Sequence, residues 1–371
     1  MSHKVSSCEV LVAGGSIIGA ACARALALRG LRVLICEPGP DPAAASAASA
    51  GILGPQIERT DETLRALGLR ARDLYGTLAP ALAATTGIDI GLWREGIASL
   101  AFEEAEAERL REAVANQRQA GLRCDWLEPA DVAERFPATA PCLGAMFAPE
   151  DGAVDAPALT RALRADAQRG GAQTVAARVN RITTILGRIT GVETTAGKIK
   201  AEHVIIAAGA WSPRIEHLPR RLPVEPIRGQ MAAAPWPADM PRTVLYYDHA
   251  YVLARSGEAI FGSTMERVGY DGGVTEAGIA EIVAAARRLL PHLPAVPTRT
   301  WAGLRPLTPD GRPIVGPDPD VRGLWYATGH GRNGVLLAAL TGEIVGDLVS
   351  TGETAVDITA WQPARPGALG S

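Results

Sequence analysis

The sequence predicts an α/β protein in which two domains alternate along the chain. The first observation is a strand, a glycine-rich turn, a helix and a second strand within residues 9–37, which together make a βαβ unit. The second observation is that strand-rich segments interrupt the chain at 86–149 and 223–301. The third is a run of apolar and small residues at 201–209, which is typical of a buried parallel strand and indicates that the first domain resumes there.

These observations define the predicted fold class more closely. We expect a Rossmann-like domain interleaved with an α+β domain that is built on an antiparallel sheet. The first domain is expected to comprise residues 1–85, 150–222 and 302–361, and the second residues 86–149 and 223–301. The Pro- and Gly-rich end of the chain, residues 362–371, is expected to be disordered.

The turn at residues 14–19 is the most informative part of the βαβ unit. In such a unit the backbone N–H groups of the turn and the helix N-terminus bind a pyrophosphate, and an acid after the second strand accepts a hydrogen bond from a ribose hydroxyl. Glu37 follows Gly19 at about the expected interval of roughly 20 residues. Ser16 stands where the usual G-x-G-x-x-G pattern has its middle glycine, so its hydroxyl would have to join the anion site. The alternative is that residues 14–19 form only a strand-to-helix turn.

Composition argues against several classes of protein. The 371 residues are 47% apolar and 21% charged, as in an ordinary soluble protein that can bury a sizeable core. A net charge of −3, a pI near 6.1 and the lack of long basic runs argue against nucleic acid or an anionic membrane as a partner. Residues 10–28 are apolar apart from Arg24, but their internal glycines and the lack of a basic flank argue against a signal peptide or a membrane span.

The cysteines point to the cellular compartment. Five of them are scattered along the chain, without the spacing of a disulfide framework or a zinc site: Cys8, Cys22, Cys36, Cys124 and Cys142. We therefore expect reduced, mostly buried thiols in a cytoplasmic protein, and no metal site.

The remaining elements follow from apolar periodicity and from turn signals. In the first half we expect helices at 60–82, 103–120, 128–136 and 155–168, and strands at 144–148 and within 88–102 on either side of a turn at 94–96. In the second half we expect strands at 173–182, 189–193, 201–209, within 214–265 and at 324–329, helices at 277–290 and 335–349, and a loop-rich stretch at 301–306.

Small residues fill the stretch at 43–51, which cannot form a core by itself. Small side chains let a backbone approach something flat or bulky. Ser46 and Ser49 are therefore candidate donors to phosphate or ribityl oxygens. The alternative is an alanine-rich connection in which the serines are incidental.

A second glycine-rich helix start, at residues 329–334, repeats the logic of the first. Asn333 is a candidate cap, and the N-terminus of the following helix presents backbone N–H groups to an anion. A nicotinamide dinucleotide needs one such site for its pyrophosphate, whereas a flavin gains from another at its pyrimidine edge, where negative charge develops on reduction. The pair of sites favours FAD over NAD.

With these residues named, nearly the whole chain, from about residue 9 to residue 349, resembles the D-amino-acid-oxidase-type superfamily of flavoproteins, and in particular its glycine-oxidising members. The most specific stretches of this resemblance are residues 245–251, 262–265, 301–306 with 310–313, and 329–334. The resemblance implies FAD that is bound without covalent attachment, and oxidation of a primary amine to an imine, with oxygen reduced to hydrogen peroxide. It also implies a role in thiamine biosynthesis.

The resemblance implies roles for particular residues. Arg305 matches the arginine that grips the substrate carboxylate, for which a planar guanidinium is suited because it binds a carboxylate bidentately. Tyr251 matches the tyrosine that assists it, Met265 and Arg332 match residues that line the pocket, and the backbone of Val179 matches a contact to adenine. Together with the turn and the small-residue stretches, the expected cofactor-binding set is Gly14, Gly15, Ser16, Ile17, Ile18, Gly19, Glu37, Ser46, Ser49, Ala50, Gly51, Ile52, Val179, Ala208, Gly209, Trp211, His330, Gly331, Arg332, Asn333, Gly334 and Val335.

Three positions depart from the family pattern. Besides Ser16, Ile52 stands where some members carry methionine beside the flavin, and Gly331 replaces a common aromatic residue; both changes alter the pocket volume.

Two histidines could be interpreted as general bases. His249 beside Asp248 suggests such a base, but hydride transfer from a neutral amine needs none, so we expect structural hydrogen bonds here and at His330.

The expected activity is FAD-dependent oxidative deamination of glycine or a small amino acid or amine. Hydride passes from Cα to flavin N5, and Arg305 and Tyr251 orient the carboxylate. The expected partners are this substrate and molecular oxygen, with no nucleic acid and no integral membrane segment; homo-oligomerisation stays open. One alternative is a D-amino-acid dehydrogenase that uses an acceptor other than oxygen. Another is a non-catalytic FAD fold that binds a partner protein.

Overall fold

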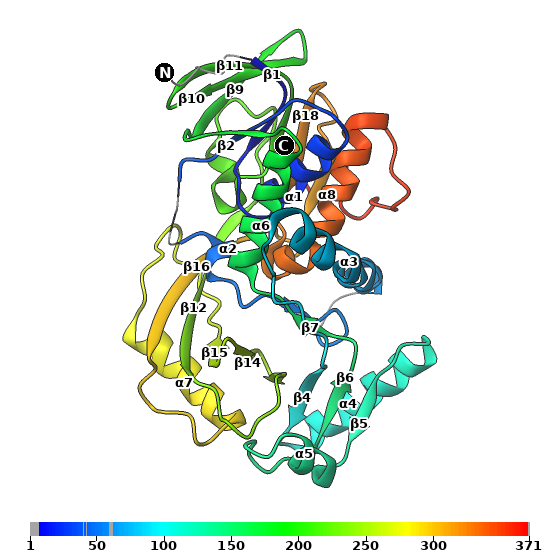
Figure 1. The fold of residues 1–371 in the computed structure, drawn as a ribbon, viewed down its shortest axis with the longest axis vertical. Helices are drawn as coiled ribbons and strands as arrows, with labels where there is room; N and C mark the ends of the chain where they lie inside the picture. The colour runs from blue at the N-terminus through cyan, green and yellow to red at the C-terminus, as the bar shows by residue number, and fades with distance from the viewer. Residues whose placement is uncertain (1–6, 40, 42, 59–61, 370–371) are drawn as a thin grey trace.

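The computed structural model describes residues 7–39, 41, 43–58 and 62–369. Two sheets of eight strands each form the framework. Figure 1 shows the first sheet with helices α1 (Ile17–Leu28), α6 (Ala156–Arg169) and α8 (Gly334–Thr351) toward one end of the long axis. The second sheet lies toward the other end with helices α4 (Glu104–Gln119), α5 (Pro129–Arg135) and α7 (Glu276–Leu289).

The first sheet is the predicted parallel one. Its parallel strands lie in the order β18-β11-β1-β2-β8, with β17 antiparallel at the edge and a meander of β9 and β10 beside β11. The bounds are β1 (Ser7–Ala13), β2 (Val33–Cys36), β8 (Gln173–Val175), β9 (Val179–Ile185), β10 (Arg188–Thr194), β11 (Gly197–Ile206), β17 (Ile314–Pro317) and β18 (Leu324–Thr328).

Helices α1, α6 and α8 pack together on one face of this sheet, and α3 (Glu62–Thr86) packs outside them. Close approach of α1 and α8 requires Gly342, where a Cβ would lie 2.7 Å from the carbonyl oxygen of Ala21. Among the described residues, the helical segment 331–351, which contains α8, is the one whose length and composition would suit a membrane span, but 56% of its apolar stretch of 18 residues is buried inside the fold. It is accordingly packed as a core helix.

The second sheet is almost entirely antiparallel, as predicted. Its strand order is β16-β12-β15-β14-β13-β4-β6-β5, and only β13 and β4 run parallel. The bounds are β4 (Ile97–Ala101), β5 (Asp125–Leu127), β6 (Gly144–Ala148), β12 (Glu225–Pro235), β13 (Val244–Tyr247), β14 (Ala250–Arg255), β15 (Glu258–Gly262) and β16 (Arg299–Leu307). Helices α5 and α7 bury apolar side chains against it, and Phe136, which follows α5, packs in the same core as Phe147 of β6.

Two local predictions were wrong. The stretch 301–306, expected to be loop-rich, is part of strand β16, which pairs with β12 at the edge of the second sheet. Pro306 is tolerated there because an edge strand need not donate a hydrogen bond from every residue. Of the two strands expected within 88–102, only β4 forms; before it, Trp93 makes a single bridge to Ala153.

Strand β16 also joins the two sheets. The Leu304 amide donates to the carbonyl oxygen of Ala43 at 2.9 Å, and the indole N–H of Trp301 donates to that of Ala48 at 3.0 Å. Ala43 precedes the short helix α2 (Ala45–Ala48), which follows the βαβ unit, and Ala48 is the last residue of that helix. After α2, strand β3 (Ile52–Leu53) forms a small antiparallel sheet with β7 (Gly152–Ala153). The predicted boundary between the two domains, between residues 301 and 302, stays a prediction.

The end of the chain differs from its prediction as far as it is described. Arg365 donates to a carboxylate oxygen of Asp310 at 2.9 Å and to the carbonyl oxygen of Pro313 at 3.0 Å, and Ala368 is buried. Residues 362–369 are therefore held by contacts, because one guanidinium satisfies several acceptors at once. The rest of the predicted disordered tail lies outside the described residues.

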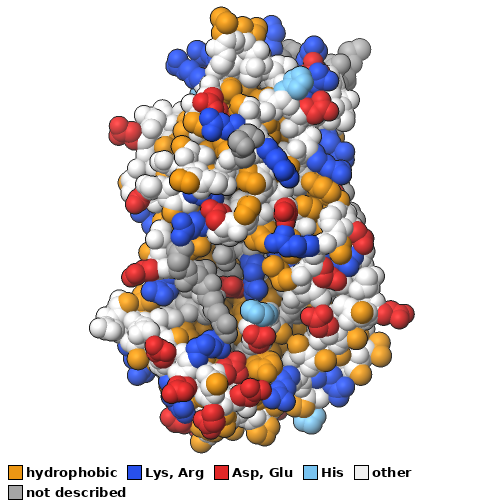
Figure 2. Space-filling model, turned by 180° about the vertical axis from the view of Figure 1, so that it is seen from behind, with side chains coloured by type: hydrophobic (Ala, Val, Ile, Leu, Met, Phe, Trp, Pro, Cys, Tyr) orange, Lys and Arg blue, Asp and Glu red, His pale blue; other side chains and the backbone are white. Residues whose placement is uncertain are grey.

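On the face seen in Figure 2, acidic and basic side chains are interspersed among apolar and uncharged ones. Such a mixture agrees with the small net charge of −3.

Candidate functional site

A cavity of about 560 Å³ lies between the two sheets, within the size range of ligand sites. Its walls include the carboxyl end of β1, the residue after β2, the segment after β11 and the start of α8. Tyr251 of β14 and Arg305 of β16 complete it from the second sheet. The cavity therefore collects the two predicted glycine-rich turns and the predicted carboxylate-binding residues.

The turn after β1 brings the backbone to the cavity wall. Gly14 has φ +103°, and a Cβ there would lie 2.6 Å from the carbonyl oxygen of Ala207. A Cβ on Gly19 would lie 1.9 Å from the carbonyl oxygen of Gly14. Only glycine fits at either position, which is the requirement of a dinucleotide-binding turn.

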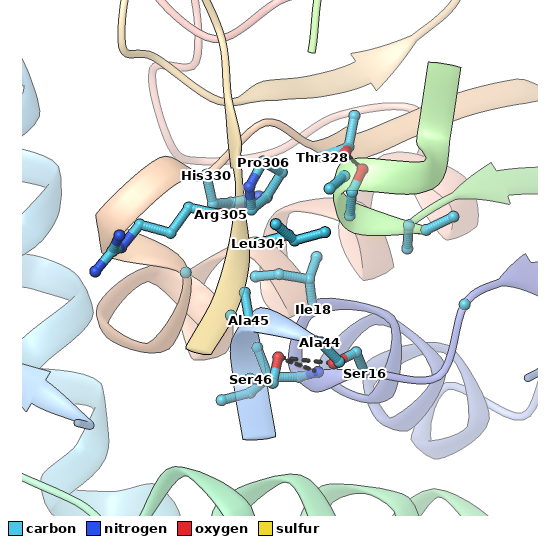
Figure 3. A pocket seen from close by; sticks show the side chains of 18 of the residues that line it. Ser16, Ile18, Ala44, Ala45, Ser46, Leu304, Arg305, Pro306, Thr328 and His330 are labelled. Atoms are coloured by element: carbon cyan, nitrogen blue, oxygen red, sulfur yellow. Dashed lines mark hydrogen bonds between the residues drawn. The ribbon is translucent and has the colours of Figure 1, made fainter. Parts of the chain in front are cut away.

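The serine in the turn finds a polar partner. Ser16 Oγ donates to Ser46 Oγ at 2.7 Å, and Ser46 Oγ also accepts from the amide of Ile17 at 3.3 Å, as Figure 3 shows. Ser16 occupies the N-cap position of α1 but its side chain makes no capping bond within that helix. Two hydroxyls therefore meet at a helix N-terminus, an arrangement suited to phosphate oxygens.

Glu37 lies at the wall next to the same turn. Its carboxylate accepts from the amide of Gly15 at 2.6 Å and lies 3.4 Å from the guanidinium of Arg164 of α6. Gly15 does not itself line the cavity, whereas Glu37 does. The carboxylate is thus fixed at the carboxyl end of β2, where a ribose hydroxyl is expected.

The second glycine-rich helix start lies at another wall of the cavity. The 3-10 turn η2 (Gly331–Asn333) precedes α8, and Gly334 and Val335 line the cavity. Asn333 is at the N-cap position, but its side chain makes no capping bond, so that part of the prediction was wrong. The backbone amide of Asn333 donates to the carbonyl oxygen of His330 within the turn.

His330 makes the structural hydrogen bond that the sequence predicted. Its Nε2 lies 3.0 Å from Thr341 Oγ1, and the side chain is buried, which lowers its pKa to about 3. His249 is exposed beside Asp248 and lies outside the cavity. Neither histidine is placed to act as a general base.

Most of the predicted cofactor-binding residues line this one cavity. Gly15 and Gly19 do not, because they support the turn from behind. Those that do are Gly14, Ser16, Ile17, Ile18, Glu37, Ser46, Ser49, Ala50, Gly51, Ile52, Val179, Ala208, Gly209, Trp211, His330, Gly331, Arg332, Asn333, Gly334 and Val335. The glycine cradle, the paired hydroxyls and the fixed carboxylate fit FAD.

Arg305 extends from β16 away from the serine pair, as Figure 3 shows. Its guanidinium donates to Ser263 Oγ at 2.5 Å and to the carbonyl oxygen of Thr264 at 3.1 Å. Within the described ranges no carboxylate lies at ion-pair distance from it. Burial lowers its pKa from the ordinary value, although arginine stays charged. This cation is therefore free to bind an anionic ligand.

Two tyrosines on adjacent strands line the same cavity as Arg305. Tyr246 of β13 and Tyr251 of β14 are directly paired, with ring centroids 5.6 Å apart, and both are buried. Burial raises the pKa of each phenol, so both stay protonated. Tyr251 contacts the sulfur of Met231 at 3.2 Å.

Arg332 differs from Arg305 in having an acidic partner. Its guanidinium lies 3.4 Å from Glu58, which also accepts from the hydroxyl of Tyr246 at 3.2 Å. The negative charge of Glu58 raises the pKa of Arg332. The substrate end of the cavity thus contains two guanidinium groups and one carboxylate, of which one guanidinium is already paired.

Met265 is placed less directly than the resemblance implies. It is 47% exposed and does not line the cavity, but its sulfur lies 3.7 Å from the guanidinium of Arg305. Met231 of β12 lines the cavity instead.

Sequence reasoning missed several residues at this end, notably Glu58, Gly229, Met231, Tyr246 and Ser263. The register of the β13–β14 hairpin could have identified Tyr246, because the short turn at 248–249 places it opposite Tyr251. The others are brought in by tertiary structure, and their local sequence carries no signal.

The cysteines are all buried or half-buried, as predicted. Cys36 alone among them lines the cavity, beside Glu37, and burial raises its pKa to about 12. It is an unreactive thiol.

The chain is similar to known proteins in sequence and in structure. The model of the family described as FAD dependent oxidoreductase matches residues 9–348. Glycine oxidase from Geobacillus kaustophilus is 37% identical over 375 residues, which cover 98% of each chain. The bifunctional protein ThiO/ThiG of Trichormus variabilis is 36% identical over 351 residues, 92% of this chain and 52% of that protein. The crystal structure of the Geobacillus kaustophilus glycine oxidase superposes with a TM-score of 0.92 at 36% identity and covers 97% of this chain and 99% of the other.

Proposed function

Because this chain belongs to the family of FAD-dependent oxidoreductases and uses FAD, we propose that it catalyses the oxidative deamination of glycine or a related small amine. The observation that carries the proposal is Arg305, a cation in the cavity wall with only neutral hydrogen-bond partners among the described residues. An amino acid supplies the carboxylate that this guanidinium lacks.

The substrate carboxylate binds between Arg305 and Tyr251. A guanidinium fixes two carboxylate oxygens in one plane, and the buried phenol donates a further hydrogen bond. Both groups are held by the sheet, so the amine and Cα of the substrate take one orientation. The reacting carbon is therefore held close to the hydride acceptor, which lowers the entropic cost of the reaction. Met231 and Tyr246 supply the buried surface that keeps water from the reacting carbon.

The residues around the first glycine turn would hold the FAD pyrophosphate and ribose, and the start of α8 faces the flavin end. FAD, when bound, supplies the acceptor for the hydride that leaves Cα. The α8 N-terminus favours negative charge in its part of the cavity, because its first amide groups have no intrahelical partner. No covalent attachment is expected, since Cys36 lies beside Glu37 and the other cysteines do not line the cavity.

Proton transfer needs no enzyme base if the amine enters neutral. The two tyrosines stay protonated, and His330 is neutral and already bonded to Thr341. The rate at subsaturating substrate should therefore rise with pH as the substrate amine deprotonates.

Glu58 selects a substrate with one negative charge. At the substrate end of the cavity, its pairing with Arg332 leaves Arg305 as the unpaired guanidinium among the described residues, which matches one carboxylate. An amino acid with a second acidic group would have to displace Glu58.

Oxygen as the electron acceptor, a cytoplasmic location, a role in thiamine biosynthesis and assembly into a homo-oligomer belong to the same proposal. The named relatives support the first and third, and the five buried or half-buried thiols support the second.

The test is to add glycine to the purified yellow enzyme without oxygen. Bleaching of the flavin absorbance by glycine is expected, followed on re-oxygenation by one hydrogen peroxide per imine released. No bleaching by glycine or by other small amines would overturn the proposal. Bleaching without peroxide would instead identify a dehydrogenase.

A further inference from the structure

Arg305 is held by hydrogen bonds to the segment that follows β15. Its two oxygen acceptors among the described residues, Ser263 Oγ and the carbonyl oxygen of Thr264, belong to consecutive residues of that segment and are both neutral. A neutral acceptor orients a guanidinium without consuming its charge. The orientation of the substrate-binding cation therefore depends on what fixes these two residues.

Glu266 is the anchor of this segment. Its carboxylate accepts from Arg228 Nε at 3.0 Å and Nη2 at 3.1 Å, from Gln230 Nε2 at 2.9 Å and from Thr264 Oγ1 at 2.8 Å. The main chains of Arg228 and Glu266 also exchange two hydrogen bonds, at 2.9 and 3.0 Å. The segment is thus attached to β12 by side chains and by backbone.

Arg228 is buried and is shared between two carboxylates. Its Nη1 donates to Asp271 at 2.8 Å, on the loop that leads to α7. The guanidinium holds the pKa of Glu266 down to about 2, so the pair is ionised at any working pH. Neutralising Glu266 removes one of the two carboxylates that compensate this buried guanidinium, which is costly.

Gly229, the next residue of β12, brings the same strand into contact with Arg305. A Cβ at this position would lie 1.9 Å from Arg305 Nη1, so the guanidinium rests on the bare backbone of β12. Strand β12 therefore constrains Arg305 from two sides: directly through Gly229, and through Arg228, Glu266 and Thr264.

From these contacts we infer that Arg228 and Glu266 are positioning residues for the substrate carboxylate. The ion pair fixes Ser263 and Thr264, which fix the plane of the Arg305 guanidinium against the β12 backbone. Bidentate binding depends on that plane, so loss of the pair weakens the binding of carboxylates in particular. This inference depends on the proposed function, since it assumes that Arg305 binds the carboxylate of the substrate.

The test compares Glu266→Gln with the wild-type holoenzyme. The KM for glycine and the Kd for acetate, read from the change in flavin absorbance, should both rise about 10- to 100-fold. The value of kcat/KM for glycine ethyl ester, which has no carboxylate, and the FAD content should not change. A merely structural role would lower activity toward glycine and its ester alike.

Two further variants keep the inference testable. Arg228→Gln combined with Glu266→Gln should be no worse than either single variant, because both act through one pair. Glu258→Gln is the matched control, since Glu258 pairs with Arg299 at 2.7 Å on the exposed part of the same sheet; its KM should stay at the wild-type value. If Glu266→Gln is too unstable to purify, Thr264→Val tests the same link.

An unchanged KM for glycine in Glu266→Gln, or an equal loss with glycine and its ester, would overturn the inference while leaving the proposed function intact. Absence of flavin bleaching by glycine in the wild-type protein would instead remove the proposed function.

Discussion

The two ends of the cavity are built by different means. At the cofactor end, the recognition groups are mainly backbone atoms and small side chains of the segment that follows β1, placed by glycines that nothing larger could replace. At the substrate end they are side chains from β13, β14, β16 and the segment after β15, which lie far apart in the sequence. Backbone recognition is thus a local property, and side-chain recognition a property of the assembled sheets.

The largest effect should come from disturbing the local end. In Gly19→Ala the new Cβ would lie 1.9 Å from the carbonyl oxygen of Gly14, so the turn must open. We expect protein that purifies with less than about a tenth of the normal FAD content, by absorbance, because the pyrophosphate site is lost. Gly76→Ala is the control: in α3 a Cβ there meets nothing within 4 Å, and the variant should retain FAD. Equal FAD content in the two variants would contradict a backbone-built site.

Arg305→Met tests the other end. The FAD content should stay normal, whereas kcat/KM for glycine should fall about 30- to 5000-fold, as expected for about 2–5 kcal/mol lost with a charged partner. Steady-state kinetics measure the effect. Arg299→Met, on the same strand but at an exposed ion pair, should change kcat/KM by no more than about threefold. A similar loss in both variants would show that β16 matters only as a strand.

Glu58→Gln tests whether Glu58 keeps Arg332 from binding a second carboxylate at the substrate end. Without its carboxylate partner, Arg332 becomes, beside Arg305, a second unpaired cation at the substrate end of the cavity. The ratio of kcat/KM for iminodiacetate to that for glycine should rise about 10-fold, equivalent to about 1.4 kcal/mol. Competition between the two substrates measures the ratio directly. An unchanged ratio would mean that Arg332 does not reach the bound substrate.

The smallest effect is the dependence of stability on pH. The pKa of His330 is about 3 in the folded protein and about 6.5 in an unfolded chain. The unfolded chain therefore binds the proton first, and the stability that neutral His330 provides is complete above about pH 6.5 and is lost as the pH falls toward 3. At pH 5 the loss is about 2 kcal/mol at most, or roughly 2–4 °C in Tm.

His330→Gln isolates this contribution, because an amide can keep the hydrogen bond to Thr341 but does not titrate. The Tm difference between pH 7 and pH 5 should be smaller in the variant than in the wild type. An identical difference in the two proteins would contradict a buried, neutral histidine.

The sequence predicts the cofactor end of the cavity better than the substrate end. The βαβ unit and Glu37 lie where local patterns placed them, because turns and strand ends are decided by neighbouring residues. Ser16 and Ser46 were each candidates, but the hydrogen bond between them joins residues 30 apart and was not predicted. Arg305 was identified through the family resemblance, although its stretch was assigned to a loop and proved to be an edge strand. Glu58 was not foreseen, since nothing near it in the sequence shows that Arg332 lies opposite. Met265 illustrates the limit of residue-by-residue transfer: its sulfur reaches Arg305, but its side chain faces outward.

The contacts of strand β16 bear on how the substrate enters the cavity and how the product leaves it. Its main chain is bonded on one side to β12 and on the other to residue 43, beside the nucleotide-binding segment. The two halves therefore have no hinge there about which they could swing apart without breaking those bonds. The amine should therefore enter, and the imine leave, without a separation of the two halves at β16.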